Sequence, residues 1–160
     1  MDYPVTSAIR VLREHNADFV PHVFDYVEKG GTKHSAETLN VDEHAVIKTL
    51  IFETDEKKPL IVLMHGDFQV SAKNLARVLN VKTVAPCSPE KAQKLSGYLV
   101  GGTSPFGTKT KMPVYVEKTI FDLPTIYING GKRGFLVSMK PQVLKDILQI
   151  QIVEVAVKNG

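Results

Sequence analysis

Residues 46–65 read VIKTLIFETDEKKPLIVLMH, and they decide the fold class because they describe two neighbouring strands of a β-sheet. Val46–Thr54 and Leu60–His65 are rich in branched and aromatic residues, and the polar residues 55–59 between them are typical of a turn. Leu60–Met64 is apolar throughout, as expected of a central strand that is covered on both faces. The stretch therefore predicts a sheet with other elements packed on either side.

Helical and extended patterns alternate on both sides of this strand pair. The predicted helices span Thr6–Asn16, Ser35–Leu39, Ser71–Leu79, Ser88–Gly97 and Pro141–Leu148, with a further turn from Asp42 and a loop over Lys29–Thr32. The other predicted strands span Phe19–Tyr26, Pro113–Lys118, Thr125–Ile128, Phe135–Ser138 and Ile150–Val157. Pro21 places the first of these at a sheet edge. We therefore expect one compact α/β (α+β) domain over 1–160, with a mixed, barrel-like β-sheet flanked by helices.

Size and composition favour a cytoplasmic protein. A chain of 160 residues can bury a core without the help of disulfides or metal. Its single cysteine excludes an internal disulfide, as is usual in a reducing compartment. No apolar run approaches the roughly 18 residues of a membrane span, and residues 1–4 lack the features of a signal peptide. We expect no membrane partner.

The positive charge is concentrated in one part of the chain. The formal net charge is +3, but residues 97–140 hold six basic side chains against two acidic ones, while the rest of the chain is slightly acidic. Such a local excess suits an anionic partner such as RNA, and it is also common on a solvated surface.

Lys48 is unusual because it stands in an apolar row. In a strand its side chain shares one face with Val46, Leu50 and Phe52. A lysine there can protect a sheet edge from aggregation, or it can direct a compact cation into a pocket, where it would bind a phosphate or a carbonyl oxygen.

Two glycine-rich stretches could bring backbone groups close to a ligand. In Gly97–Gly107, GYLVGGTSPFG, strand-like residues lead into paired glycines, and the backbone there could hold an anion or simply form a tight turn. In Thr125–Gly134, TIYINGGKRG, the Asn-Gly pair predicts a hairpin. Lys132 and Arg133 at its tip would be solvated charges or phosphate contacts.

Familiar catalytic sets are missing from the sequence. The five histidines have no metal-ligand spacing, which favours single surface histidines. Cys87 precedes a helix start, where a thiolate is favoured, but it has no recognisable partner that would make it a nucleophile.

Together, three segments in this order resemble the YbaK/EbsC group of the YbaK–ProX editing superfamily. They are Ile47–Leu50, Gly97–Gly107 and Thr125–Gly134, and the resemblance extends from about Thr6 to the last strand. It implies a free-standing relative of the editing domain of prolyl-tRNA synthetase that hydrolyses the ester of Cys-tRNA(Pro). Its partners would be that aminoacyl-tRNA and prolyl-tRNA synthetase, with no metal and no cofactor.

The resemblance also implies the site residues. Lys48 would be the essential lysine, and Gly101 and Gly102 would lie at the reacting ester. The expected substrate-binding residues are Phe24, Thr103, Ser104, Pro105, Asn129, Gly130, Lys132 and Arg133. The substrate's own thiol would attack its carbonyl, since no enzyme nucleophile is evident.

Three positions depart from the family pattern. Phe24 stands where a tyrosine is common, Asn129 replaces a serine, and Leu136 replaces a polar residue. These changes concern amino-acid selection, so a deacylase for Ala- or Ser-tRNA is one alternative. A non-catalytic module that binds aminoacyl-tRNA or a synthetase is another.

Overall fold

The computed structural model describes residues 2–158 and is built around the strand pair expected from residues 46–65. Strands β2 (Val46–Thr54) and β3 (Pro59–His65) are antiparallel and pair from Ile47–His65 to Glu53–Pro59. The predicted pair is therefore confirmed.

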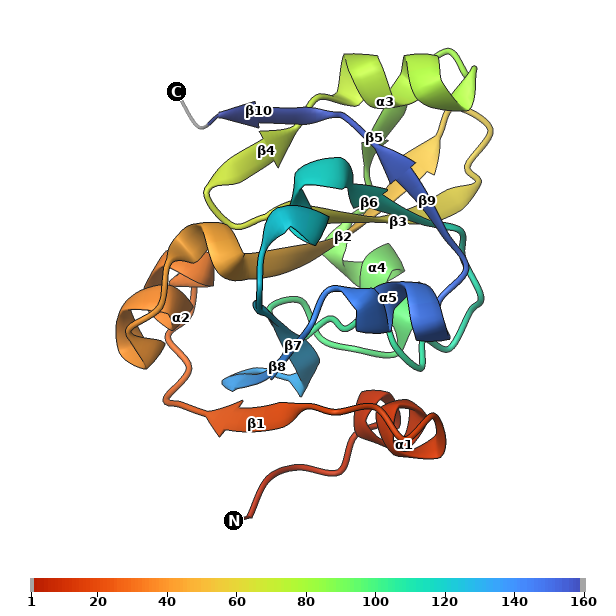
Figure 1. Cartoon of the computed structure of the whole chain (residues 1–160). Helices are drawn as coiled ribbons and strands as arrows, with labels where there is room; N and C mark the ends of the chain where they lie inside the picture. The colour runs from red at the N-terminus through yellow and green to blue at the C-terminus, as the bar shows by residue number, and fades with distance from the viewer. Residues whose placement is uncertain (1, 159–160) are drawn as a thin grey trace.

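This pair lies inside a mixed sheet with the strand order β1-β8-β7-β2-β3-β6-β9, with β5 also pairing with β2 (Figure 1). The other strands are β1 (Val20–Val23), β5 (Val84–Pro86), β6 (Val114–Glu117), β7 (Ile126–Lys132), β8 (Phe135–Met139) and β9 (Ile150–Val153). Three of the pairings are parallel and the others antiparallel. A separate small sheet joins β4 (Phe68–Val70) to β10 (Ala156–Lys158).

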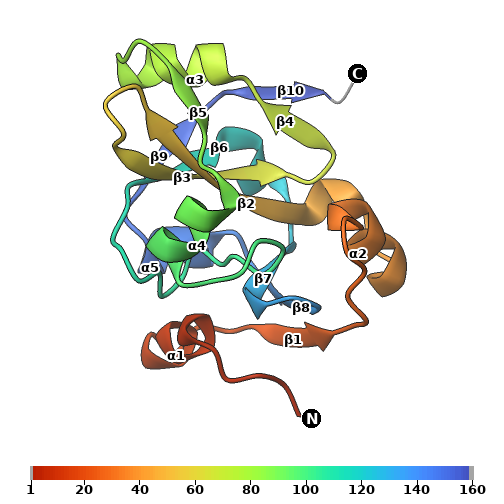
Figure 2. The same ribbon diagram turned by 180° about the vertical axis from the view of Figure 1, so that it is seen from behind.

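Within residues 2–158, five α-helices and two short 3₁₀ helices cover the sheet. They are α1 (Ser7–Glu14), α2 (Gly31–Leu39), α3 (Ala72–Leu79), α4 (Pro89–Ser96), α5 (Gln142–Ile147), η1 (Glu43–Ala45) and η2 (Lys118–Asp122). Helix α5 faces the viewer in Figure 1 and α4 does so in the reverse view of Figure 2, so they lie on opposite sides of the molecule. Ser71 and Ser88 cap α3 and α4 as expected, because each side chain accepts a backbone N–H of the first turn. None of the described helices has the length and apolarity needed to cross a membrane.

The strand Pro59–His65 divides the interior into two cores. Ile61 and Leu63 face a large core that also receives residues of β2, β6, β7, β8 and α1. Leu60, Val62 and Met64 face a second core under α3. The run is apolar throughout because both of its faces are buried, as the sequence predicted. Inward residues of five strands meet in the large core, which gives the sheet its barrel-like character, although its pairing path ends at β1 and β9.

Several boundaries differ from the prediction for identifiable reasons. Helix α2 begins at Gly31 rather than Ser35, because the Ser35 hydroxyl donates to the Gly31 carbonyl within the helix and does not cap it. The short strands β4 and β5 were not predicted. The last predicted strand is two strands in different sheets: the buried Glu117 carboxylate accepts the Val155 N–H at 2.7 Å between them.

The basic hairpin is confirmed, but its turn lies further along than Asn129-Gly130. Strand β7 continues to Lys132, and the two-residue turn is Arg133-Gly134, with Gly134 at φ 75°. The Asn129 side chain accepts the N–H groups of Gly131 and Lys132 and so supports a bulge inside the strand. The strand-like residues in Gly97–Gly107 form no strand: the segment is irregular.

Candidate functional site

Lys48 lies on the face of β2 that points away from the large core. Its neighbour Ile47 faces that core, whereas Val46 packs in a small cluster under α2. The half-buried Lys48 ammonium donates to the Phe68 backbone carbonyl. Burial lowers the pKa of Lys48, and the carboxylates of Glu43 and Asp67 partly offset this by raising it. The lysine is therefore held in place at the start of β4 and is not a freely solvated edge residue.

The pairing between β2 and β7 ends just before Lys48. Strand β7 pairs with β2 only at Val46–Tyr127 and Ile47–Ile128, and β5 joins the same strand at Phe52. Ile47 and Ile128 both face the large core, so the residues that follow them, Lys48 in β2 and Asn129 in β7, lie on the opposite face. The Asn129 amide donates to the Gly101 carbonyl at 3.1 Å. One asparagine thus links the glycine loop to the strand beside Lys48.

The two glycines of the loop have different environments. Gly101 is exposed at φ 92°, and a methyl group added to it would lie 2.8 Å from the Tyr26 hydroxyl oxygen. Gly102 is buried against the hairpin, where an added methyl would lie 2.7 Å from the Arg133 backbone nitrogen. The Gly102 N–H already donates to the Leu99 carbonyl at 2.8 Å. Gly101 is thus open to a ligand, whereas Gly102 serves the packing of the loop.

The hydroxyl residues that follow hold the loop together. Ser104 is fully buried, and its hydroxyl accepts the Phe106 N–H at 3.1 Å. Pro105 is buried as well, and the half-buried Thr103 donates to the Leu99 carbonyl at 3.4 Å. The predicted direct substrate contacts of Ser104 and Pro105 therefore need correction, because neither side chain is accessible.

The basic hairpin meets the loop through Arg133. Its Nε donates to the Val100 carbonyl at 2.9 Å, and its guanidinium lies 5.1 Å from the centre of the Tyr26 ring. Lys132 is exposed. Gly130 is buried, and a methyl added there would lie 2.5 Å from Phe135, so its role is to pack the strand. Phe24 packs on the apolar cluster beneath α2.

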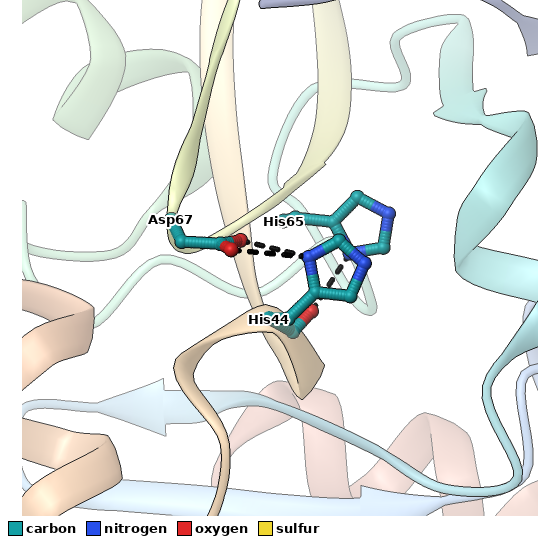
Figure 3. A group of neighbouring side chains, drawn as sticks. All are labelled: His44, His65 and Asp67. Atoms are coloured by element: carbon teal, nitrogen blue, oxygen red, sulfur yellow. Dashed lines mark hydrogen bonds and ion pairs between the residues drawn. The ribbon is translucent and has the colours of Figure 1, made fainter. Parts of the chain in front are cut away.

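A histidine cluster corrects the expectation of single surface histidines. His44 and His65 stack with ring centres 3.7 Å apart and planes 6° apart, and His44 Nδ1 lies 2.9 Å from an Asp67 oxygen (Figure 3). His65 is fully buried, with Nδ1 2.7 Å from the His44 carbonyl and Nε2 2.7 Å from the Thr119 hydroxyl. Burial lowers the pKa of His65.

The potential ligand atoms of His44, His65 and Asp67 lie within 4.8 Å of one another, yet their geometry does not suit a metal ion. Both nitrogens of His65 are used in hydrogen bonds, and the lone pairs of two parallel stacked rings do not converge on one point. The Phe68 ring packs edge-on against both imidazoles. Since the Phe68 carbonyl holds Lys48, the cluster supports the residue that orients the lysine.

The environment of Cys87 overturns the expectation that its thiolate is favoured. Burial raises the pKa of the Cys87 thiol, and the neighbouring Glu53 raises it further. Sequence reasoning missed Tyr26 and the histidine cluster, because neither belongs to a motif and their partners are distant in the chain. The stacked histidines are 21 residues apart.

Comparison with known proteins places the chain among editing proteins. The family model described as "Aminoacyl-tRNA editing domain" matches residues 30–147. A curated relative from Enterococcus faecalis, named "Putative Cys-tRNA(Pro)/Cys-tRNA(Cys) deacylase EbsC", is 25% identical over 96% of this chain and 94% of its own length. A proline–tRNA ligase of Levilactobacillus brevis is 29% identical over 61% of this chain, but the match spans only 17% of the ligase.

Solved structures share the fold. One titled "Crystal structure of a putative trans-editing enzyme for prolyl tRNA synthetase" superposes with a TM-score of 0.81 at 21% identity, covering 99% of this chain and 100% of its own. A hypothetical protein, APE2540, gives a TM-score of 0.85 at 17% identity over 95% of this chain and 100% of its own.

Proposed function

This chain belongs to the aminoacyl-tRNA editing domain family, and from that premise we propose that it is a trans-editing hydrolase that removes cysteine from Cys-tRNA(Pro). The similarity to the curated deacylase supports this proposal because it covers nearly the whole of both chains. The match to 17% of a proline–tRNA ligase, taken alone, would be equally consistent with a fragment of a ligase.

The observation that carries the proposal is the placement of Lys48. Its ammonium is half-buried and held by a backbone carbonyl, on a strand that pairs with β7. Strand β7 carries Asn129, which donates to the carbonyl of the exposed Gly101. A fixed cation and an accessible loop backbone on neighbouring strands can bind the ribose–phosphate end of a charged tRNA and polarise its ester. A lysine that only protected a sheet edge would have a solvated ammonium and would not be bound by a backbone carbonyl.

The chemistry proposed is attack by the substrate's own thiol. A carbon–sulfur bond forms at the carbonyl, the bond from that carbon to the ribose oxygen breaks, and the thiol proton passes to the leaving ribose oxygen. Water then opens the cyclic thioester to free cysteine. Holding thiol and carbonyl together supplies the proximity that favours this step.

Cys87 and Ser138 are candidate protein nucleophiles because of their chemistry or a nearby histidine, and neither is well placed. Cys87 has a raised thiol pKa. Ser138 lies 2.9 Å from His22 Nε2, but it is only 8% exposed, and no carboxylate among residues 2–158 contacts His22. Both observations favour a reaction that uses the substrate's thiol.

The exposed charges suggest how the tRNA is held. Lys132 and Arg133 project from the hairpin next to the glycine loop, where they would contact phosphates. Prolyl-tRNA synthetase is the proposed partner, and the cytoplasm, where tRNA is charged, is the proposed location. The departures at Phe24, Asn129 and Leu136 keep Ala- and Ser-tRNA as alternative substrates.

The deciding experiment measures hydrolysis of Cys-, Ala- and Ser-tRNA(Pro) by the purified protein. Release of cysteine well above the spontaneous rate, with slow release of alanine, is the expected result, because alanine has no side-chain nucleophile. Rapid release of alanine would refute thiol attack and favour an Ala-tRNA deacylase. Release of none of the three, with binding of tRNA retained, would instead indicate a non-catalytic binding module.

A further inference from the structure

We propose that Tyr26 is a further catalytic residue, whose hydroxyl donates a hydrogen bond to the ester carbonyl oxygen as that oxygen becomes negative beside Gly101. This inference rests on the proposed deacylase function. It assigns this donor to a residue outside the three segments that resemble the family.

The position of the Tyr26 hydroxyl is defined by Gly101. A methyl group on Gly101 would lie 2.8 Å from the hydroxyl oxygen and 3.2–3.3 Å from the two nearest ring carbons, Cε1 and Cζ. The hydroxyl end of the side chain therefore occupies the space that a larger residue would fill at position 101. Because Gly101 is exposed, a carbonyl group placed over this backbone would come within reach of the phenol.

Arg133 holds the Tyr26 ring in this position. Its guanidinium covers the ring at 5.1 Å from the centre, and its Nε is itself fixed to the Val100 carbonyl. The tyrosine backbone is also close to the hairpin, since the Tyr26 nitrogen lies 3.5 Å from a methyl group built on Gly134. The attraction between a cation and the ring face holds the phenol in one orientation.

The Tyr26 hydroxyl is available, whereas the Asn129 amide at the loop is not. The Asn129 amide donates to the Gly101 carbonyl, and its oxygen accepts two backbone N–H groups. Among residues 2–158, no hydrogen-bond partner is found for the Tyr26 hydroxyl, and the residue is 38% exposed. Phe24 provides no hydroxyl, and the phenol of Tyr98 in the loop is buried and donates to the Phe106 carbonyl at 2.6 Å.

The variant Tyr26→Phe tests this proposal because it removes one oxygen and keeps the ring, its packing and the Arg133 contact. A donor to a developing oxyanion is worth ~10²–10³ in rate in a closed site, and we expect about 10- to 100-fold lower kcat in this partly exposed one. KM and the Kd for uncharged tRNA should change less than about twofold, since the donor acts in the transition state.

The matched control is Tyr3→Phe, which also loses one phenolic oxygen, the one that accepts from Arg13 on α1. It should hydrolyse Cys-tRNA(Pro) at the parent rate. A Tyr26→Phe protein with the parent melting temperature and the parent kcat would overturn the proposal and leave Tyr26 as a packing partner of Gly101. A change confined to KM or tRNA affinity would overturn it too, in favour of a binding surface. A parent protein that hydrolyses none of the esters would refute the proposed function itself, and this inference with it.

Discussion

Replacing Lys48 with methionine removes the charge but keeps most of the apolar stem in the row with Val46 and Leu50. The lost hydrogen bond to the Phe68 carbonyl is half-exposed, so water can replace it, and the free energy of unfolding should fall by about 0.5–1.5 kcal/mol. If the ammonium also contacts the phosphate or the ester, the transition state loses about 2–4 kcal/mol, or ~30- to 1000-fold in rate.

The assay is hydrolysis of Cys-tRNA(Pro) in a single turnover with enzyme in excess, accompanied by a separate measurement of binding to uncharged tRNA. Weaker binding with a modest loss of rate would assign Lys48 to the phosphate or ribose. A loss of rate with unchanged binding would assign it to the ester. Lys48→Arg should be nearly as inactive as Lys48→Met or Lys48→Ala, because a planar guanidinium does not fit where a compact ammonium donates to one carbonyl.

Lys73→Ala is the matched control, since Lys73 is an exposed lysine on α3. It should keep the parent rate. A Lys48→Met protein that is folded and hydrolyses Cys-tRNA(Pro) as fast as the parent would refute the site assignment. The binding-module alternative would then be favoured.

Three further predictions follow from the hairpin, the thiol and the histidine cluster. Lys132→Ala should reduce the dependence of log Kd for tRNA on log salt by about 0.7–0.9 if the side chain contacts one phosphate, and an unchanged slope would place this exposed charge in solvent. Cys87→Ser should leave deacylation within about twofold of the parent, because burial raises the thiol pKa; a hundredfold loss in a folded variant would exclude thiol attack by the substrate alone. Burial lowers the pKa of His65 below its ordinary value near 6.5, so at pH values between the two the unfolded chain binds more protons at His65 than the folded chain does. The contribution of neutral His65 to stability is therefore complete above pH 6.5 and is lost as the pH falls toward the folded-state pKa. Urea unfolding at pH 7.5 and pH 5 should therefore show a smaller loss of stability in His65→Asn than in the parent, and equal losses would contradict this role.

Much of the fold could be predicted because its signals are local. The apolar run Leu60–Met64 indicated burial on both faces, and the structure gives each face its own core. The caps at Ser71 and Ser88 fixed two helix starts, since each hydroxyl bonds to its own first turn. The C-terminal segment was misjudged because its interruption depends on Glu117, 38 residues earlier in the chain.

The sequence by itself determined the family resemblance, the strand pair and the isolated position of Lys48 in an apolar row, because motif order and periodicity are properties of neighbouring residues. Only the tertiary structure decided which groups of the glycine loop are accessible. Ser104 proved to be buried, Gly102 to be packed against the hairpin, and Gly101 to lie under the Tyr26 hydroxyl. The contacts of Gly102 with Arg133 and of Gly101 with Tyr26 join residues 31 and 75 positions apart. A hydrogen bond or a close packing contact acts over only a few ångströms, so its partners are set by where the folded chain returns and not by their spacing along it.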